Sequence, residues 1–393
     1  MVAGFSLFCL SVSAQKKEHP DRHIDNQGRQ EEVEENTKKF DANEVIFGHV
    51  LDAHQFHFFS YKDKEGELHH AGIPLPVILY APEKGGFHFF SSSKFHHGEE
   101  QHEGFLLVTE EYRQALAKSG KFSKEEIKAI RNESIIAVDE NGAPLTDIKV
   151  YDFSLTRNVV QMFIALALLV WMLVAAAKRY RERGSSKAPK GMQNLVEVFV
   201  TFTRDEVAKP NLGSKYKKYM PYLLTIFFFI LINNIVGLVP GTANVTGNIA
   251  FTLVLGLISF VVILFSSNSH YWGHIFNPPV PGGVKPIMIP VEVLGIFTKP
   301  IALIVRLFAN MIAGHIIIIC LISLIFIFGN LNSGVGWGFS PISIAFTVFI
   351  YFIEILVAFL QAYIFTNLTA VFIGQAFEGG HDDVDHHEDA VIV

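Results

Sequence analysis

The sequence predicts a mainly α-helical membrane protein with about five transmembrane helices, the last two long and tilted, and a small amino-terminal β-rich domain outside the cytoplasm. Half of the 393 residues are hydrophobic and 36 are Phe, which is typical of a membrane protein. Most long apolar runs follow residue 155, and no Asp, Glu, Lys or Arg occurs from Tyr219 to Val284. The polar part before residue 155 alternates short apolar runs with turn residues, as strands do. The net charge of -6 is modest and indicates no nucleic-acid partner.

The amino-terminal end is expected to contain two segments without a folded core. Residues 1–14 have a short apolar stretch ending in Val12-Ser13-Ala14, which predicts a cleaved signal peptide, with a short membrane anchor as the alternative. Residues 15–44 are charged and poor in apolar side chains, which predicts a flexible linker.

Residues 45–152 are predicted to form the β-rich extracytoplasmic domain. The strand-like runs are HQFHFFSY, PVILYAP, FHFFSSS and GFLLVT, with one helix near Lys124 to Arg131. Eleven of the 17 His lie between His19 and His102, but their spacing matches no recognised ligand set, so surface histidines are favoured over a metal site. Cys9 and Cys320 form neither a metal motif nor an expected disulfide, and we predict no cofactor.

The membrane domain is predicted to cover residues 155–377. A first helix at Val159 to Ala177 is followed by the basic run KRYRERGSSKAPK, which places the next loop in the cytoplasm and the amino-terminal domain outside. Residues 192–208 should form an amphipathic helix, either on the cytoplasmic surface or packed in the bundle. Further spans are expected at 219–239, 249–267, 287–328 and 341–376.

The last two helices are predicted to be too long to cross a membrane upright. Helices of 35 to 40 residues reach roughly 50 to 60 Å, whereas the hydrocarbon core is about 30 Å thick. They must therefore be tilted or bent, and Pro300 offers one place to bend. Five crossings that start outside place the acidic tail, residues 378–393, in the cytoplasm, where we expect it to be disordered.

Arg306 and Glu354 are the only formally charged residues between Lys299 and Glu378. An arginine at the centre of a membrane helix costs roughly 2.5 to 3.5 kcal/mol on insertion scales. Because the guanidinium pKa exceeds about 12, the charge is permanent, as an ion pathway requires.

Helical spacing gathers the polar residues of both long helices on stripes. At 100° per residue Arg306, Asn310 and Ala313 share one face, which Glu292 and Lys299 extend backward. The last helix carries the polar and small stripe Ser343, Thr347, Glu354, Ala358 and Gln361, which should face protein or water. In an antiparallel pair, Glu354 would lie at the depth of His315 and Gln361 at that of Arg306. A buried Arg306–Glu354 ion pair, or polar contacts that merely join helices, is the alternative.

The run RLFANMIAGH, from Arg306 to His315, closely resembles subunit a of the F-type ATP synthase, the stator half of its membrane motor. Lys299-Pro300 before this run, and Glu354 and Gln361 after it, extend the resemblance, which covers roughly residues 155–377. The segment LINNIVGLVPGTANVTGNIAFTL, which contains Asn234, is also similar to the family.

The resemblance implies a role in proton translocation for particular residues. Arg306 would be the essential arginine that faces the rotating ring of c subunits, and His315 and Glu354 would belong to a polar half channel, with Asn310 and Gln361 near the arginine. Secondary candidates are Glu292, Lys299, Ser343, Thr347 and Asn234. Many bacterial members have Glu and His at the two channel positions in the opposite order, some have Asp where this chain has Gly237, and the large outer domain is not a general family feature.

The resemblance further implies a non-catalytic subunit of a bacterial inner-membrane complex, with a periplasmic amino-terminal domain and a cytoplasmic carboxyl terminus. Its partners would be the c-subunit ring, the b-subunit peripheral stalk, other ATP synthase subunits and membrane lipid. The transported ion would be H⁺, with Na⁺ as an alternative, because the site on the ring selects it. The chain has no Walker-type glycine-rich loop, so nucleotide chemistry would belong to other subunits.

Two other classes of function are alternatives to the hypothesis of an ATP synthase subunit. A secondary transporter could use Arg306 to bind an anionic substrate, but it predicts internal repeats with paired broken helices, which the sequence does not show. A membrane-anchored sensor could bind a ligand through its outer domain. Five spans with buried charges are more elaborate than an anchor requires.

Overall fold

The structure is a computed structural model, and it describes residues 52–62, 68–98, 100–119, 122–145, 147–183, 190–239, 242–277 and 283–378. The predicted signal peptide 1–14, the linker 15–44 and all of the acidic tail 378–393 except Glu378 lie outside these residues.

The described residues of the amino-terminal domain form three small antiparallel sheets, which confirms the predicted β-rich class. Strand β1 (Gln55–Lys62) pairs with β2 (Leu68–Pro74), β3 (Pro76–Ala81) lies between β4 (Gly86–Ser91) and β7 (Tyr151–Asp152), and β5 (Phe105–Leu107) pairs with β6 (Ile135–Ala137). Short 3-10 turns cover Pro82–Lys84 and Ser92–Gly98. The core of the domain consists of apolar side chains from these elements, among them Val77, Leu79, Phe95, Phe105 and Ile135.

Two helices accompany these sheets, and only one was expected. Helix α4 (Lys124–Ala129) lies at the predicted place and begins with a capping box, in which Ser123 and Glu126 bond each other's backbone N–H groups. Helix α3 (Glu110–Ser119) was not predicted. Its sequence EEYRQALAKS is polar, and only Leu116 is buried, so it has almost no apolar periodicity to detect.

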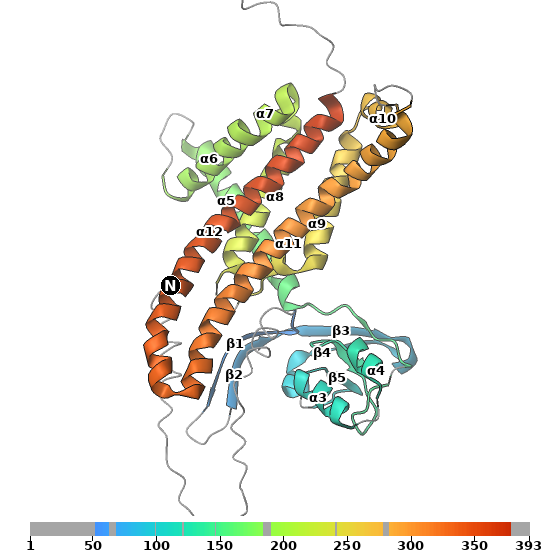
Figure 1. Cartoon of the computed structure of the whole chain (residues 1–393), viewed down its shortest axis with the longest axis vertical. Helices are drawn as coiled ribbons and strands as arrows, with labels where there is room; N and C mark the ends of the chain where they lie inside the picture. The colour runs from blue at the N-terminus through green and yellow to red at the C-terminus, as the bar shows by residue number, and fades with distance from the viewer. Residues whose placement is uncertain are drawn as a thin grey trace, which may run out of the picture. The chain divides into compact units, whose positions relative to one another are not determined.

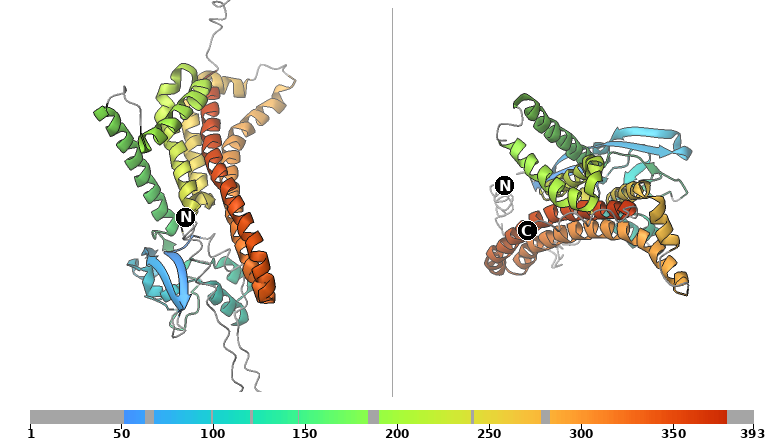
Figure 2. Two further views of the ribbon diagram at one scale, coloured as in Figure 1. Left: turned by 90° about the vertical axis from the view of Figure 1, so that its left-hand side faces the viewer. Right: turned by 90° about the horizontal axis from the view of Figure 1, so that it is seen from above.

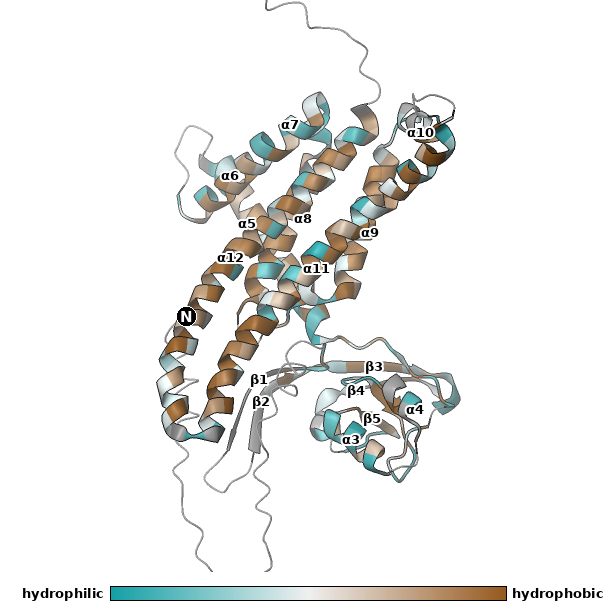
Figure 3. Cartoon of the chain, viewed as in Figure 1, coloured by the Kyte–Doolittle hydropathy of each residue, from teal (hydrophilic) through white to brown (hydrophobic). Residues whose placement is uncertain are grey.

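Five helices in the described part of the chain are long and apolar enough to cross a membrane, which confirms the predicted fold class (Figure 1). Figure 3 shows that hydrophobic residues predominate along the two long helices nearest the viewer, α11 and α12, with hydrophilic residues at isolated positions. The helical elements are α5 (Arg157–Arg183), α6 (Met192–Phe202), a π-helical turn (Thr203–Ala208), α7 (Lys209–Leu212), a 3-10 turn (Gly213–Lys215), α8 (Tyr216–Gly237), a 3-10 turn (Val245–Gly247), α9 (Ile249–Ser266), α10 (Ser269–Phe276), α11 (Lys285–Leu331) and α12 (Ser333–Glu378).

Helices α11 and α12 run side by side as an antiparallel hairpin that reverses at Asn332 (Figures 1 and 2). They contain 47 and 46 residues, more than predicted. The predicted start of the last helix, Pro341, lies inside α12 without ending it, and α11 continues through Pro290 and Pro300. A membrane helix tolerates proline where its neighbours satisfy the freed backbone groups. At about 1.5 Å per residue each helix spans about 70 Å, so both must cross the membrane at a steep tilt.

Helix α6 packs within the bundle rather than standing apart from it. Phe199 contacts the rings of Phe227 and Phe359, at centroid distances of 5.8 Å each, and Phe202 contacts Tyr363 at 5.4 Å. These rings belong to α8 and α12. Residues 192–208 were predicted to form a helix either on the cytoplasmic surface or packed in the bundle. These contacts favour the packed helix.

The first membrane helix is tied to the amino-terminal domain by its first two backbone N–H groups. Arg157 N–H donates to the carbonyl of Ala53 at 2.9 Å, and Asn158 N–H donates to Oδ1 of Asp52 at 3.1 Å. The first N–H groups of a helix have no partner within it, so these bonds act as caps. The chain just before β1 is thereby fixed to the start of α5.

A buried histidine strengthens the same junction. His54 is 4 % exposed, and its Nε2 lies 2.7 Å from Oδ2 of Asp152, at the end of β7. Ser154 donates its backbone N–H to the other oxygen of this carboxylate. Sequence spacing alone could not reveal the pair, since its members are 98 positions apart.

The Asp152 carboxylate should make part of the outer domain's stability depend on pH. Burial alone would raise the pKa of Asp152, but hydrogen bonds from His54 and Ser154 outweigh it and hold the pKa below its ordinary value of 3.8. Because the folded-state pKa is the lower one, the stabilisation is complete above the ordinary pKa and is lost as pH falls through the folded value.

We expect Asp152→Asn to weaken hydrogen-exchange protection of the β3 amides in the full chain at pH 6. The difference from wild type should shrink as pH falls below about 4. Exposed Asp147→Asn is the matched control and should change little. A difference for Asp152→Asn that stayed constant with pH would contradict this assignment.

Candidate functional site

Three contacts fix the register of α11 against α12. The Ser343 hydroxyl donates to the carbonyl of Leu321, the Glu354 carboxyl packs against Gly314, and Lys299 Nζ donates to Oε1 of Gln375 at 3.0 Å. These pairs run in opposite directions along the two helices, as an antiparallel hairpin requires.

The polar stripe of α12 is buried in the described structure. Its members are Ser343, Thr347, Glu354, Ala358 and Gln361, and their exposed fractions are 1 %, 2 %, 6 %, 0 % and 4 %. The helix faces beside the stripe carry exposed Phe, Ile and Leu side chains. The prediction that this stripe faces protein or water rather than lipid is thus confirmed in its geometry.

The arginine stripe of α11 has the opposite orientation. Arg306, Asn310 and Ala313 are all exposed, as predicted for residues that share a face. The buried face of α11 near Arg306 is instead apolar and includes Leu303, Leu307, Met311 and Ile318. A permanent charge that a membrane helix turns outward requires a partner or water.

The structure separates Arg306 from Glu354. Glu354 packs at Gly314, eight residues beyond Arg306, which corresponds to about 12 Å along the helix axis. Over the part of the chain that the structure describes, Arg306 is a member of no salt bridge. The alternative of a buried ion pair between the two residues is therefore wrong for this conformation.

Gly314 is a functional position that the sequence analysis missed. A Cβ built at Gly314 would overlap the Glu354 carboxyl, so a larger residue there would force this carboxyl to move. The neighbouring residue His315 is half-buried, and Glu354 thus lies at the depth predicted for His315. The small pair Ala313-Gly314 was the sequence signal for a close helix approach, but spacing does not show which of the two residues the neighbouring helix meets; Gly314 is buried and Ala313 is exposed.

Gln361 falls near the level of the arginine. It lies seven positions after Glu354, and the opposite helix seven positions before Gly314 carries Leu307, next to Arg306. Gln361 is buried in α12, whereas Arg306 and Asn310 point outward from α11. The structure thus brings these residues to one depth but places them on different sides of the hairpin.

Two side-chain amides and one hydroxyl from α8 and the α8–α9 connection contact the long hairpin near Glu354 and His315. Asn234 is fully buried, donates to the carbonyl of Ala358 at 3.2 Å and accepts from Thr246 at 2.7 Å. Asn244 donates to the carbonyl of Met311 at 3.1 Å. Ala358 lies about one helical turn after Glu354, and Met311 lies about one turn before His315. Of these polar groups, the sequence analysis had named only Asn234.

A second group reinforces that connection from the first membrane helix. Gln161, 2 % exposed, donates to the carbonyl of Ala243 and accepts from its N–H at 2.7 Å. Gly237 lies beside the same segment, since a Cβ there would meet the Ala243 carbonyl at 3.4 Å. The connection that carries Asn244 and Thr246 is therefore clamped between two helices.

Lys299 and Glu292 lie toward the other end of α11. Lys299 bonds Gln375 and sits 5.1 Å from the centre of the Phe372 ring, so it joins α11 to the last turns of α12. Glu292 is half-buried, seven positions earlier. These positions fit an interhelical contact more directly than a place beside Arg306.

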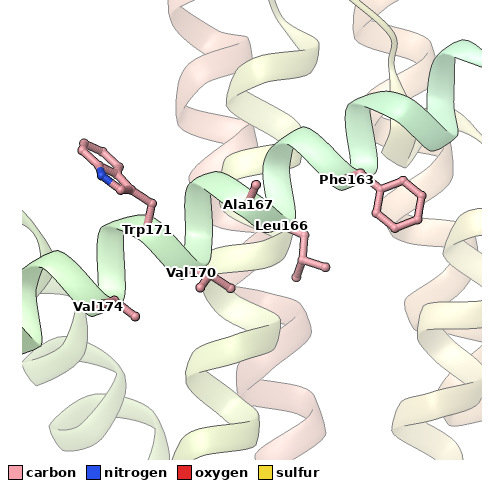
Figure 4. A pocket seen from close by; sticks show the side chains of 6 residues that line it. All are labelled: Phe163, Leu166, Ala167, Val170, Trp171 and Val174. Carbon is pink, nitrogen blue, oxygen red and sulfur yellow. The ribbon is translucent and has the colours of Figure 1, made fainter.

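Other parts of the described chain offer weaker candidates. The described residues contain no group of three or more His, Cys, Asp or Glu side chains that could hold a metal ion. A shallow hollow on α5 is lined by apolar side chains alone, as Figure 4 shows, and carries no group for chemistry. Its residues are Phe163, Leu166, Ala167, Val170, Trp171 and Val174.

Comparisons with known proteins identify two matching families. Residues 159–374 match the family model described as ATP synthase A chain, and residues 45–153 match a Domain of unknown function (DUF8433). The chain is 49 % identical over 244 residues to ATP synthase subunit a of Chloroherpeton thalassium, which covers 61 % of this chain and 71 % of that protein. It is 44 % identical over 249 residues to ATP synthase subunit a 2 of Chlorobaculum tepidum, covering 62 % and 69 %. For ATP synthase subunit a of Myxococcus xanthus the identity is 41 % over 245 residues, covering 61 % and 78 %.

Gly314→Ala should destabilise the α11–α12 hairpin. The added Cβ would overlap the Glu354 carboxyl, and overpacking of this kind typically costs about 1 to 3 kcal/mol. We expect a lower unfolding temperature of the purified protein in detergent. Gly295→Ala, on the same helix with open space at the Cβ position, is the matched control and should be neutral or slightly stabilising.

The double variant Gly314→Ala with Glu354→Ala removes the overlapping oxygens and should recover much of the loss. A Gly314→Ala protein as stable as the control would show that Glu354 does not occupy this space.

Proposed function

Because the chain belongs to the ATP synthase A chain family, we propose that it is the ion-conducting stator subunit of the membrane sector of an ATP synthase, with Arg306 facing a rotating ring of c subunits. The outward exposure of Arg306 carries the proposal. Within the described residues Arg306 forms no salt bridge with its own hairpin. Its charge is therefore available to a carboxylate from another subunit.

The electrostatics of such an encounter favour proton release. A carboxyl group on the ring is kept protonated while it faces lipid, because burial disfavours the charged form. At about 4 Å and an effective dielectric near 20, attraction to Arg306 amounts to about 4 kcal/mol. This is roughly a thousandfold change in favour of the carboxylate. The arginine therefore drives each carboxyl that reaches it to give up its proton.

The two ends of the hairpin suit two separate proton routes. Glu354, His315 and the polar chain through Asn234 and Thr246 lie between Arg306 and the side of the membrane where α5 begins, and we assign the first half channel to them. The second half channel would open toward the opposite side, past Lys299 and Glu292. Since Arg306 lies between the routes, protons cross only by riding on the ring, and each charge contributes about 2.3 kcal/mol per 100 mV.

The orientation and partners follow from the same proposal. The basic segment after α5 favours a cytoplasmic loop, which places the amino-terminal domain in the periplasm and the carboxyl terminus in the cytoplasm. The subunit itself would catalyse no nucleotide chemistry. Its partners would be the c-subunit ring and the b-subunit peripheral stalk, with H⁺ as the ion and Na⁺ as the alternative.

Arg306→Ala should abolish coupled proton transport without preventing assembly. Loss of about 4 kcal/mol of attraction predicts at least a hundredfold fall in ATP-driven proton pumping by the reconstituted complex. Arg306→Lys, which keeps a charge but not the planar fork, should retain a small part of the activity. Lys217→Ala, an exposed lysine outside the hairpin, is the control. Normal pumping by Arg306→Ala would refute the mechanism.

Exchanging His315 and Glu354 should be tolerated better than removing either residue. Both titratable groups would still lie at the depth of Gly314, so a proton could pass between them. We expect pumping by the double exchange to exceed that of His315→Ala and of Glu354→Ala. Comparable losses in all three variants would count against a working pair.

A further inference from the structure

One face of the three-stranded sheet β4-β3-β7 is aromatic and open. In β3 the alternate residues Val77, Leu79 and Ala81 are at most 1 % exposed and face the core. Ile78 and Tyr80 therefore lie on the other face. The strand register places four aromatic residues beside them. We call the six residues the aromatic face: Ile78, Tyr80, Phe87, Phe89, Tyr151 and Phe153.

The aromatic face is contiguous and accessible over the described residues. Phe87, Phe89, Tyr151 and Phe153 are 61 %, 68 %, 49 % and 62 % exposed. Tyr80 links them, with ring centroids 4.7 Å from Phe87 and 6.3 Å from Tyr151, and Phe87 lies 6.0 Å from Phe89. The outer face of an antiparallel sheet normally carries polar side chains. A contiguous apolar one marks a surface that something covers.

The aromatic face is continuous with the membrane surface through the chain itself. Strand β7 ends at Asp152, and the first span begins at Arg157. Pairing with β3 continues beyond β7, since Phe153 N–H donates to the Ile78 carbonyl and Leu155 N–H to the Pro76 carbonyl. Arg157 is four positions after Phe153, at most about 14 Å of extended chain. Phe153 therefore lies close to the depth at which hydrocarbon begins.

The junction holds the sheet at this depth. The bonds of Asp52 and Ala53 to the first N–H groups of α5, and of His54 to Asp152, attach the sheet to the helix at more than one point. Beyond the junction, α5 continues the apolar surface with Phe163 and Ile164, which are 54 % and 55 % exposed. A hinge at residues 153–156 alone could not swing the sheet away from the bilayer.

We propose that the aromatic face lies on the lipid bilayer, in the headgroup region on the side where α5 begins. Aromatic rings accumulate at that level of a membrane, and Tyr80 and Tyr151 can keep their hydroxyls among the headgroups. None of the six residues is charged, so none resists burial there. The outer domain thus rests on the membrane and holds the first turn of α5 at a fixed depth.

A fluorescence experiment on the full chain tests the proposal. Cys9 and Cys320 are replaced by Ser, and a single new cysteine, Ser91→Cys or Phe89→Cys, receives an environment-sensitive dye. Ser91 lies on the same side of β4 as Phe87 and Phe89, and changing it leaves the aromatic face intact. The control is Lys118→Cys, at an exposed position of α3. Each protein is placed singly in phosphatidylcholine nanodiscs.

The quenchers distinguish lipid from water. We expect lipids with a spin label near the headgroup to quench both sheet probes, and aqueous iodide to quench them at least threefold less than the Lys118 probe. Adding Phe87→Glu to the Ser91→Cys protein should increase the quenching of its dye by iodide. Equal iodide quenching at all sites would overturn the proposal. Shielding from both iodide and spin-labelled lipid would also overturn it, and would mean that protein covers the face.

Discussion

The close approach of α11 and α12 at Gly314 is the constraint on which the candidate site depends. Two apolar helices in lipid gain little from hydrophobic burial, so their register must come from packing and polar contacts. Here a carboxyl occupies the space of a missing side chain, while Ser343 and Lys299 bond the opposite helix on either side of it. Fixing this register leaves Arg306 on the outside of the hairpin. The burial of Glu354 and the exposure of Arg306 thus both follow from the close packing at Gly314.

The polar groups around this contact are of two kinds. Buried amides and hydroxyls, such as Asn234 and Thr246, satisfy one another and the backbone, so they can lie in the interior at little cost. The arginine cannot be satisfied in that way, because its charge is permanent and its five donors are fixed in a plane. The interior therefore holds hydrogen-bonding amides and hydroxyls beside the buried Glu354 carboxyl, and the permanent charge of Arg306 is left on the exposed face of α11.

The spans and their stripes were predictable because they depend on residue spacing alone. Long uncharged runs and the 100° step gave the five spans, the buried stripe of α12 and the common face of Arg306 and Asn310. Contacts between distant segments were not predictable. Gln161 meets Ala243, and His54 meets Asp152, only after folding brings them together. Helix α3 escaped detection because it buries only Leu116, and Gly314 because spacing does not show which small residue a neighbouring helix approaches.

The length of α11 has a geometric consequence for any route along it. A helix of about 70 Å is more than twice as long as a hydrocarbon layer of about 30 Å is thick, so α11 cannot lie upright within that layer. Lys299 and His315 are about 24 Å apart along the axis, and a tilt makes part of that separation lateral rather than vertical. Residues at different depths of the membrane are then displaced sideways as well. The tilt of one helix thus converts distance along the chain into distance in the plane of the membrane.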